Sequence, residues 1–295
     1  MSRHTPSRPV DMEKLFPELL PYRRESVRLH PRPGSPTFKD SSVGGPLLWP
    51  ASEPWPVCRE EHYDTDTASR LEPAVAMVPI VQVRRVDAPG IPFPEGTDLL
   101  QVLWCPYAHG VFCYPLPRVH WRDSGAIGDV LPTPAPAAGL PEDWYPACCA
   151  VYPEHVTEYP SRDLPDEVYD AIRGRFDALL TETGLLYSYH LAEAPGIKLG
   201  GYPSWTQEPA WPDCKGCGSR MEHLLTVSSW EFDGESWLTW LPEEDRADEN
   251  ETGGRRWKND AHNPTRLCLG DAGGVYLFEC RICPERPIGH WFDCS

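Results

Sequence analysis

Four cysteines in the C-terminal half form two pairs with the spacing of metal-binding knuckles. Cys214 and Cys217 enclose Lys-Gly, Cys280 and Cys283 enclose Arg-Ile, and 62 residues separate the two pairs. A Cys-x₂-Cys turn brings two thiolates to one side of a tight loop, where a tetrahedral Zn²⁺ binds each sulfur at about 2.3 Å. Two such turns complete a Cys₄ shell without an open coordination position. We therefore predict a structural zinc site.

Two other interpretations of these cysteines stay open. The four side chains could be ordinary reduced thiols, or one pair could be a redox centre. A thioredoxin-like pair needs a helix N-terminus behind it to lower the pKa of its first thiol. Pro212 and the glycine after Cys217 disfavour such a helix. Gly216 and Gly218 suit a knuckle instead, because glycine lets backbone N–H groups turn toward sulfur.

The N-terminal half shows fewer signs of a metal site. Cys58 follows Trp-Pro-Val, but Glu61 stands where a second knuckle cysteine would be. We therefore expect no metal there, with Cys105 and Cys113 as core thiols. The segment WCPYAHG also brings Cys105 close in sequence to His109. A catalytic dyad needs spatial proximity and a third group to orient the histidine, so we expect a buried thiol beside a surface histidine.

The segment that leads to Cys214 occurs twice. GGPLLWPASEPWPVC at 44–58 and GGYPSWTQEPAWPDC at 200–214 align without a gap at an offset of 156 residues. Short apolar runs flanked by Gly and Pro follow both copies, and such runs are typical of β-strands. Such self-similarity indicates a duplicated unit. We predict an α+β fold with internally duplicated, mostly antiparallel β-sheets in two pseudo-equivalent halves and few helices.

The duplication suggests a division of the chain into two halves. We assign them to residues 1–150 and 151–295. The repeat unit of the first half covers about 43–115, and the zinc-knuckle unit of the second covers about 199–284. Proline accounts for 35 of the 295 residues, and because it breaks helices and central strands, we expect short strands and many turns.

One substantial helix is expected, at about 165–183, between the two copies. Its start is marked by Pro165 and its end by Gly184. Apolar residues recur there at helical spacing and define one buried face: Val168, Ile172, Phe176, Leu179 and Leu180. The segment MEKLFPELL near the N-terminus is a shorter helical candidate, interrupted by Pro17.

Each copy of the repeated segment carries two tryptophans: Trp49 and Trp55 in the first, Trp205 and Trp211 in the second. A tryptophan buries a large area and needs one partner for its N–H group. These residues could fix a loop onto a sheet, or they could line an aromatic binding groove. We keep all four as candidate binding residues.

The overall charge and the termini restrict the class of protein. The formal net charge is −17, which disfavours nucleic acid because phosphate binding needs clustered Lys and Arg. The N-terminus carries no signal-peptide-like apolar stretch, and no window of the sequence approaches the apolar length of a membrane span. We expect a cytoplasmic protein with no membrane partner, and in that compartment the cysteines are expected to be thiols or metal ligands.

The sequence contains few signs of an active site. The motifs G-x-S-x-G, H-E-x-x-H, G-x-x-x-x-G-K-[ST] and G-x-G-x-x-G are absent from the sequence. His223 and His290 stand without a recognisable ligand pattern. We expect a protein without catalytic residues.

These motifs together resemble a known family. Gly-Gly-x-Pro-x-Trp, Trp-Pro-x-Cys-x-x-Cys-Gly, Met221 before HLLTV, and GDAGGVYLFECRICP are similar to the YwqG family of bacterial proteins of unknown function. The second half also resembles the zinc-knuckle region of the programmed cell death protein 2 family. The resemblance covers about 199–284 well and about 43–106 more loosely. It implies a duplicated antiparallel α+β protein without established enzymatic activity, whose eukaryotic relatives act as dedicated chaperones of a ribosomal protein.

Three classes of function are compatible with these features. The favoured one is a non-enzymatic protein-interaction module, chaperone-like or neutralising, with a structural zinc site and a basic protein partner. The alternative is a hydrolase-like enzyme with an unrecognised Cys/His site in a groove between the halves. A nucleic-acid-binding zinc module is disfavoured, because 44 acidic residues outnumber 27 Lys and Arg.

Overall fold

The computed structural model describes residues 2–63, 74–110, 114–136, 139–248, 255–258 and 260–294. Two six-stranded sheets and a two-stranded ribbon make up most of this part of the chain. In spatial order the first sheet contains β10 (Glu154–Glu158), β1 (Arg24–Arg28), β11 (Lys198–Gly200), β12 (Glu222–Ser228), β13 (Gly274–Glu279) and β14 (Ile288–Asp293). The second contains β2 (Arg32–Pro33), β9 (Cys149–Ala150), β3 (Ser42–Val43), β6 (Val78–Arg84), β7 (Leu99–His109) and β8 (Tyr114–Arg122). The ribbon pairs β4 (Val57–Cys58) with β5 (Val75–Ala76).

Helices are few within the described residues. The α-helices are α1 (Met12–Leu15), α2 (Asp166–Thr183), α3 (Tyr187–His190) and α4 (Trp237–Trp240). Short 3₁₀ helices are Pro17–Tyr22, Arg85–Asp87, Ser124–Ala126, Glu142–Trp144 and Glu243–Asp245. All the paired strands run antiparallel. The predicted α+β class with mostly antiparallel sheets is therefore confirmed.

The duplication is visible in the strand order. β3-β6-β7-β8 in one sheet corresponds to β11-β12-β13-β14 in the other. The irregularities correspond too: the β6–β7 register shifts between Pro79 and Val81, and the β12–β13 register shifts between His223 and Leu225. Each shift begins two residues after a methionine, which is Met77 before β6 and Met221 before β12. Corresponding bulges are expected when two units share one ancestral backbone.

Each sheet is completed by strands from elsewhere in the chain. β1 pairs inside the first sheet, and the chain then continues into β2 at the edge of the second. β9 pairs inside the second sheet, and the chain then continues into β10 at the edge of the first. The two sheets therefore do not follow the division at residue 150, because β1 lies in the sheet of the C-terminal half.

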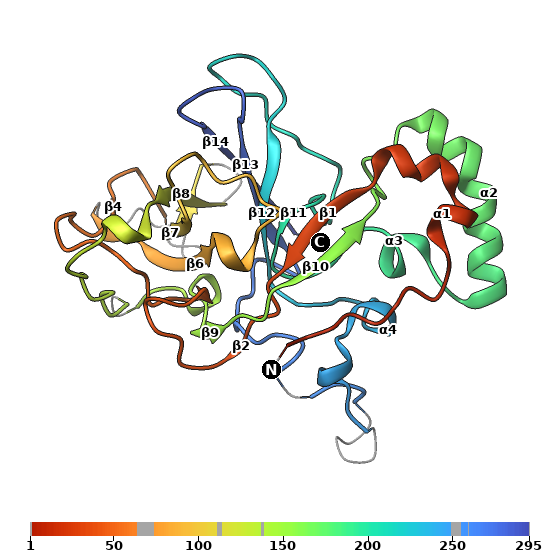
Figure 1. The fold of residues 1–295 in the computed structure, drawn as a ribbon, viewed down its shortest axis with the longest axis horizontal. Helices are drawn as coiled ribbons and strands as arrows, with labels where there is room; N and C mark the ends of the chain where they lie inside the picture. Colours follow the sequence, from red (N-terminus) through yellow and green to blue (C-terminus); the bar gives the residue numbers. More distant parts are fainter. Residues whose placement is uncertain are drawn as a thin grey trace.

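One hydrophobic core joins the two sheets. It contains fully buried side chains of both, such as Val81 and Val102 from the second sheet and Leu225 and Leu277 from the first. A separate cluster packs the helices, with Phe16, Ile172 and Leu179 among its members. In Figure 1, α1, α2 and α3 gather at one end of the molecule and β4, β6, β7 and β8 at the other.

The predicted helix at 165–183 is present as α2, which begins at Asp166 and ends at Thr183. Gly184 follows in the left-handed conformation, with φ 75°, which is typical of a residue after a helix C-terminus. Ile172 and Leu179 are buried as expected, but Leu180 is 42 % exposed. The prediction for Leu180 was wrong because the cluster that buries Ile172 and Leu179 of α2 does not include it. Among the described residues, no helix combines the length and apolarity that crossing a membrane requires.

Candidate metal centres

The four cysteines predicted as zinc ligands lie together in the folded chain. The sulfur atoms of Cys214, Cys217, Cys280 and Cys283 all lie within 4.8 Å of one another. The Sγ atoms of Cys214 and Cys283 are 3.8 Å apart, and those of Cys217 and Cys280 are 3.6 Å apart. A tetrahedron with Zn–S bonds of about 2.3 Å has edges of about 3.8 Å. The four sulfurs therefore have the separations that a single Zn²⁺ requires.

Each pair is held by a tight turn at the end of a strand or bridge. In the first turn the Gly218 N–H donates to the Cys214 carbonyl at 2.7 Å, and the Cys214 N–H donates to the Ser219 carbonyl at 2.8 Å. Gly218 has φ +72°, a conformation that glycine adopts without steric cost. In the second turn the Cys280 N–H donates to the Pro287 carbonyl at 2.9 Å. The turns follow from the glycines and prolines in the sequence, and the pairing of β12 with β13 brings them together.

The environment of these sulfurs favours thiolate in one position. Hydrogen bonds from the Ser219 backbone, the Ser219 side chain and Cys280 lower the pKa of Cys217 to about 6. Cys214 and Cys280 are buried, while Cys217 is exposed and Cys283 is intermediate. A lowered thiol pKa makes metal binding easier at neutral pH, because the metal binds the thiolate. The cluster is thus a geometrically complete candidate metal centre at the surface of the first sheet.

A second cluster lies in the N-terminal half. The ligand atoms of Cys58, His62, Cys105 and His109 also lie within 4.8 Å of one another, and all four residues are buried. The Cys58 sulfur is 3.8 Å from Nε2 of His109. The hydrogen bond from Cys105 lowers the pKa of Cys58 and raises the pKa of Cys105.

The chain positions the two histidines by backbone contacts. The N–H of Tyr63 donates to the Ala108 carbonyl at 3.0 Å, and the N–H of Ala108 donates back to the Tyr63 carbonyl at 3.2 Å. This bridge joins the loop after β4 to the end of β7. The rings of His62 and His109 consequently lie with their centroids 5.6 Å apart.

This cluster corrects three expectations from the sequence. His109 is only 5 % exposed and is therefore not a surface histidine. Cys105 is buried as expected, but it belongs to a cluster of potential ligands and is not simply a core thiol. The absence of a metal-binding arrangement was inferred from Glu61, yet the next residue, His62, supplies the ligand atom. Cys113 lies outside the described residues.

A signal for this cluster was present in the sequence. Cys58 and His62 are separated by three residues, and Cys105 and His109 are separated by three residues as well. A gapless alignment of the two halves compares residue 61 with Cys217 and so misses a ligand that lies one residue further on. The longer spacing is physically reasonable, because imidazole places its nitrogen further from the backbone than cysteine places its sulfur.

The four tryptophans are built into the loops that carry the clusters. Trp49 and Trp205 are 1 % and 7 % exposed, and Trp55 and Trp211 are partly buried. Their indole N–H groups donate within the protein: Trp49 to the Glu53 carbonyl, Trp55 to the Met77 carbonyl, and Trp205 and Trp211 to the Asp163 carboxylate. These contacts support the interpretation that the tryptophans fix loops onto the sheets. A role in binding stays a prediction.

Trp205 also borders a cavity on the face of the first sheet. The cavity has a volume of about 420 Å³, and Tyr189, Glu193, Trp230 and Tyr276 contribute to its wall. Burial raises the pKa of Glu193 to about 7, while the Ser161 backbone N–H and side chain donate to its carboxylate. No sequence pattern indicates this cavity, because its lining comes from five separate segments.

A shallower hollow of about 700 Å³ lies beside the second cluster. Its described lining includes His109, Glu60 and Glu61 from the first half and His290 from the second. Neither Cys105 nor His223 is among the described residues that line it. His223 is instead buried: its Nδ1–H donates to the Gly200 carbonyl, and its Nε2 pairs with the Thr226 hydroxyl. A Cys/His hydrolase needs a cysteine, a histidine and a carboxylate in one pocket. The described lining of this hollow supplies the histidine and carboxylates but no cysteine.

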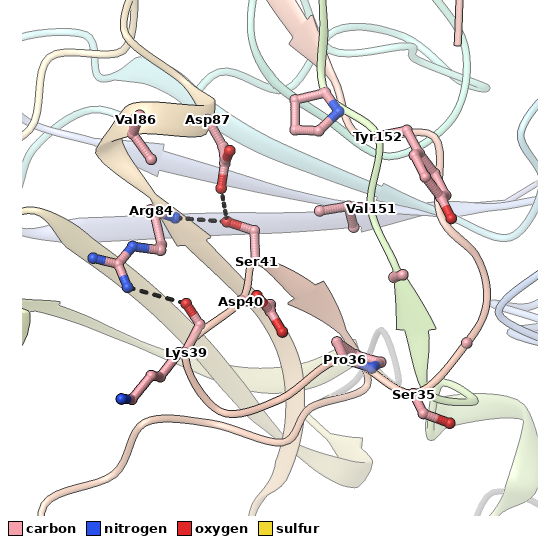
Figure 2. Close-up of a pocket in the computed structure, with 13 residues that line it drawn as sticks. Ser35, Pro36, Lys39, Asp40, Ser41, Arg84, Val86, Asp87, Val151 and Tyr152 are labelled. Carbon is pink, nitrogen blue, oxygen red and sulfur yellow. Dashed lines mark hydrogen bonds between the residues drawn. The ribbon is translucent and has the colours of Figure 1, made fainter. Parts of the chain in front are cut away.

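Another hollow, of about 620 Å³, lies between the loop before β3, the end of β6 and the segment after β9. Figure 2 shows that some of its polar groups are paired with one another. Ser41 donates to the Asp87 carboxylate at 2.5 Å and accepts from the Arg84 N–H at 2.9 Å, and the Arg84 side chain donates to the Lys39 carbonyl at 3.0 Å. The described residues that line it include no cysteine or histidine. This hollow has no obvious chemistry.

Comparison with known proteins gives no further guidance on these centres. No protein-family model matches the chain, and no curated protein matches it significantly.

Proposed function

We propose that this chain is a non-enzymatic protein-interaction module, chaperone-like or neutralising, that carries a structural Zn²⁺ at Cys214, Cys217, Cys280 and Cys283. The observation that carries the proposal is the mutual proximity of the four sulfurs, within 4.8 Å. Four thiolates fill the tetrahedral shell of zinc and leave no position for water or substrate. A zinc held in this way stabilises a fold but performs no chemistry.

The charge of the protein supports a basic polypeptide as the partner. A net charge of −17 attracts basic chains over distances comparable to the Debye length and speeds their association. It also disfavours nucleic acid, whose phosphates would be repelled. The described cysteines form no disulfides, which supports a reducing compartment such as the cytoplasm.

The resemblance to the YwqG family and to the zinc-knuckle region of the programmed cell death protein 2 family supports the same proposal. Those knuckle-bearing relatives hold one client chain before assembly. By analogy, the loops that carry the tryptophans and the zinc site would contact the partner. Such an inference from family resemblance concerns the mode of binding and not the identity of the partner.

The experiment is a capture of partners on the immobilised full-length protein from an extract of the cells that produce it. We expect a basic protein that is retained at low salt and released at high salt, because exposed charges are screened within a Debye length of about 3 Å at 1 M salt. The C217S/C283S variant serves as a matched bait, since it keeps every Asp, Glu, Lys and Arg residue but removes two of the proposed ligands. A partner that binds equally at all salt concentrations, or no partner at all, would contradict the proposal.

A further inference from the structure

We propose that Cys58, His62, Cys105 and His109 form a second zinc site, in which both sulfurs and the Nε2 atoms of both histidines bind one Zn²⁺. This site uses different residues from the Cys₄ centre and does not depend on the proposed protein-binding role. Five observations carry it: position in the duplicated fold, orientation of the imidazoles, an unpartnered nitrogen, ligand separation and charge.

The first cysteine of the cluster occupies the position that Cys214 has in the other half. Cys58 aligns with Cys214 in the repeated segment. The Met77 N–H donates to the Pro56 carbonyl at 2.9 Å, and the Met221 N–H donates to the Pro212 carbonyl at the same distance. The loops that carry the two cysteines are thus anchored to their sheets by corresponding hydrogen bonds.

The second cysteine also has a counterpart. Val78 pairs with Trp104 in the second sheet, and the corresponding Glu222 pairs with Glu279 in the first. Cys105 directly follows Trp104, and Cys280 directly follows Glu279. The duplication therefore places two sulfurs of each cluster at matching points, and a second ligand follows each of them, as cysteine in one half and as histidine in the other.

The imidazole rings are oriented as metal ligands are. Nδ1 of His62 lies 2.9 Å from the Glu60 carbonyl, and Nδ1 of His109 lies 3.0 Å from the Glu61 carbonyl. A carbonyl can only accept, so Nδ1 must carry the proton and Nε2 must present its lone pair. A hydrogen bond from the non-ligating nitrogen to a backbone carbonyl is the usual outer-shell contact of a metal-binding histidine.

One of these nitrogens has no hydrogen-bond partner among the described residues. Nε2 of His62 is buried without a partner, and the His62 side chain is fully buried. A buried polar atom left unpaired costs about 1–3 kcal/mol. A metal ion among the four ligand atoms removes this cost, since it accepts the lone pair that no N–H group reaches.

The separations fit a tetrahedral ion with mixed ligands. Zn–S and Zn–N bonds of about 2.3 and 2.0–2.1 Å give a sulfur-to-nitrogen edge of about 3.6 Å. The Cys58 sulfur and Nε2 of His109 are 3.8 Å apart. All four ligand atoms lie within 4.8 Å of one another, which is near the edge lengths of such a tetrahedron.

The charge of each complex matches the burial of its cluster. Zn²⁺ with four thiolates carries two negative charges, and this cluster includes the exposed Cys217 and the half-exposed Cys283. Zn²⁺ with two thiolates and two neutral imidazoles carries no net charge, and its four ligands are all buried. Because burial of a net charge is costly, histidine in place of cysteine is the physically favourable choice in the buried half.

The test is the zinc content of the purified full-length protein and of paired variants. We expect two zinc ions per chain in the wild type, one in C58S/H109N, one in C214S/C217S, and none when all four substitutions are combined. Wild type with a single zinc that C214S/C217S removes would overturn the proposal. So would a C58S/H109N variant that retains two.

Reconstitution of the wild type with Co²⁺ gives a readout that does not depend on the folding of any variant. We expect two equivalents to bind, with d–d bands of both an all-sulfur site and a mixed sulfur–nitrogen site. The H62A variant should lose the mixed-site bands and keep the all-sulfur bands, because it removes one nitrogen ligand of the second site alone. Binding of a single equivalent with all-sulfur bands alone would refute the second site.

Discussion

Gly201 brings the backbone of the repeated segment against a buried carboxylate. Its φ is +65°, and a Cβ at this position would lie 2.3 Å from the Glu158 carboxylate and 2.8 Å from Cβ of Ser26. The corresponding Gly45 also has a positive φ, +84°. Gly201 and its counterpart Gly45 are therefore required by the backbone conformation, and Gly201 is required by close packing as well.

We predict that Gly201→Ala lowers the free energy of unfolding by more than the backbone effect alone. The left-handed conformation costs alanine roughly 1–2 kcal/mol, and the clash with Glu158 adds to this cost. Gly96→Ala is the control, because Gly96 has φ +74° with no atom within 4 Å of its Cβ position. Denaturant unfolding measures both. Equal losses in the two variants would show that the clash has no energetic effect.

At the scale of the elements, a buried ion pair joins three strands of the first sheet. Lys198 of β11 lies 2.8 Å from the Glu158 carboxylate of β10, and both side chains are fully buried. Ser26 of β1, the strand between them, donates to the same carboxylate at 2.6 Å, and the Tyr202 N–H donates to it at 3.0 Å. The pair thus fixes the register of strands from distant parts of the chain.

We predict that Lys198→Met destabilises the protein by about 3–5 kcal/mol, because it leaves the Glu158 charge buried without its partner. The double variant K198M/E158Q should recover a large part of this loss, since it removes both charges. Unfolding free energies of the wild type, both single variants and the double variant form the required cycle. A double variant that loses the sum of the two single effects would contradict the interpretation.

At the scale of the whole molecule, ionisable side chains are buried where the chain passes between the two sheets. His30 is fully buried, and its Nε2 lies 3.0 Å from the Glu154 carboxylate. Burial, together with the neighbouring Arg28, lowers the pKa of His30 to about 3. His30 is therefore neutral in the folded protein throughout the neutral and mildly acidic range.

This lowered pKa makes stability depend on pH. Between pH 3 and 6.5 the unfolded state binds a proton at His30 that the folded state does not, so stability is greatest above pH 6.5 and falls as the pH decreases. We predict that His30→Asn reduces the slope below pH 6.5 by up to about 1.4 kcal/mol per pH unit. Asparagine suits the φ of +44° at this position.

The comparison should be made by denaturant unfolding at matched pH values. Acid-induced loss of metal affects wild type and variant alike, so the difference between the two isolates His30. A variant with the same slope as the wild type would mean that His30 does not titrate differently on unfolding.

The sequence by itself determined the parts of this protein that depend on local spacing and on repetition. The two Cys-x₂-Cys turns, the duplicated strands and the helix that begins near Pro165 all follow from residues within a few positions of one another. A turn or a helix is decided by φ preferences and periodicity, which neighbouring residues set. The proximity of the turns at Cys214 and Cys280 could be anticipated because both lie at matching ends of paired strands.

Only the tertiary structure decided which distant segments meet. The entry of β1 into the sheet of the C-terminal half depends on packing around a core shared by both sheets, which no local pattern encodes. The proximity of His62 to His109 depends on a backbone bridge between residues 63 and 108, and His109 is buried where it contacts Cys58, Glu61 and His62. These outcomes are set by the shape of the assembled sheets, because burial and ligand convergence are properties of neighbours in space and not of neighbours in sequence.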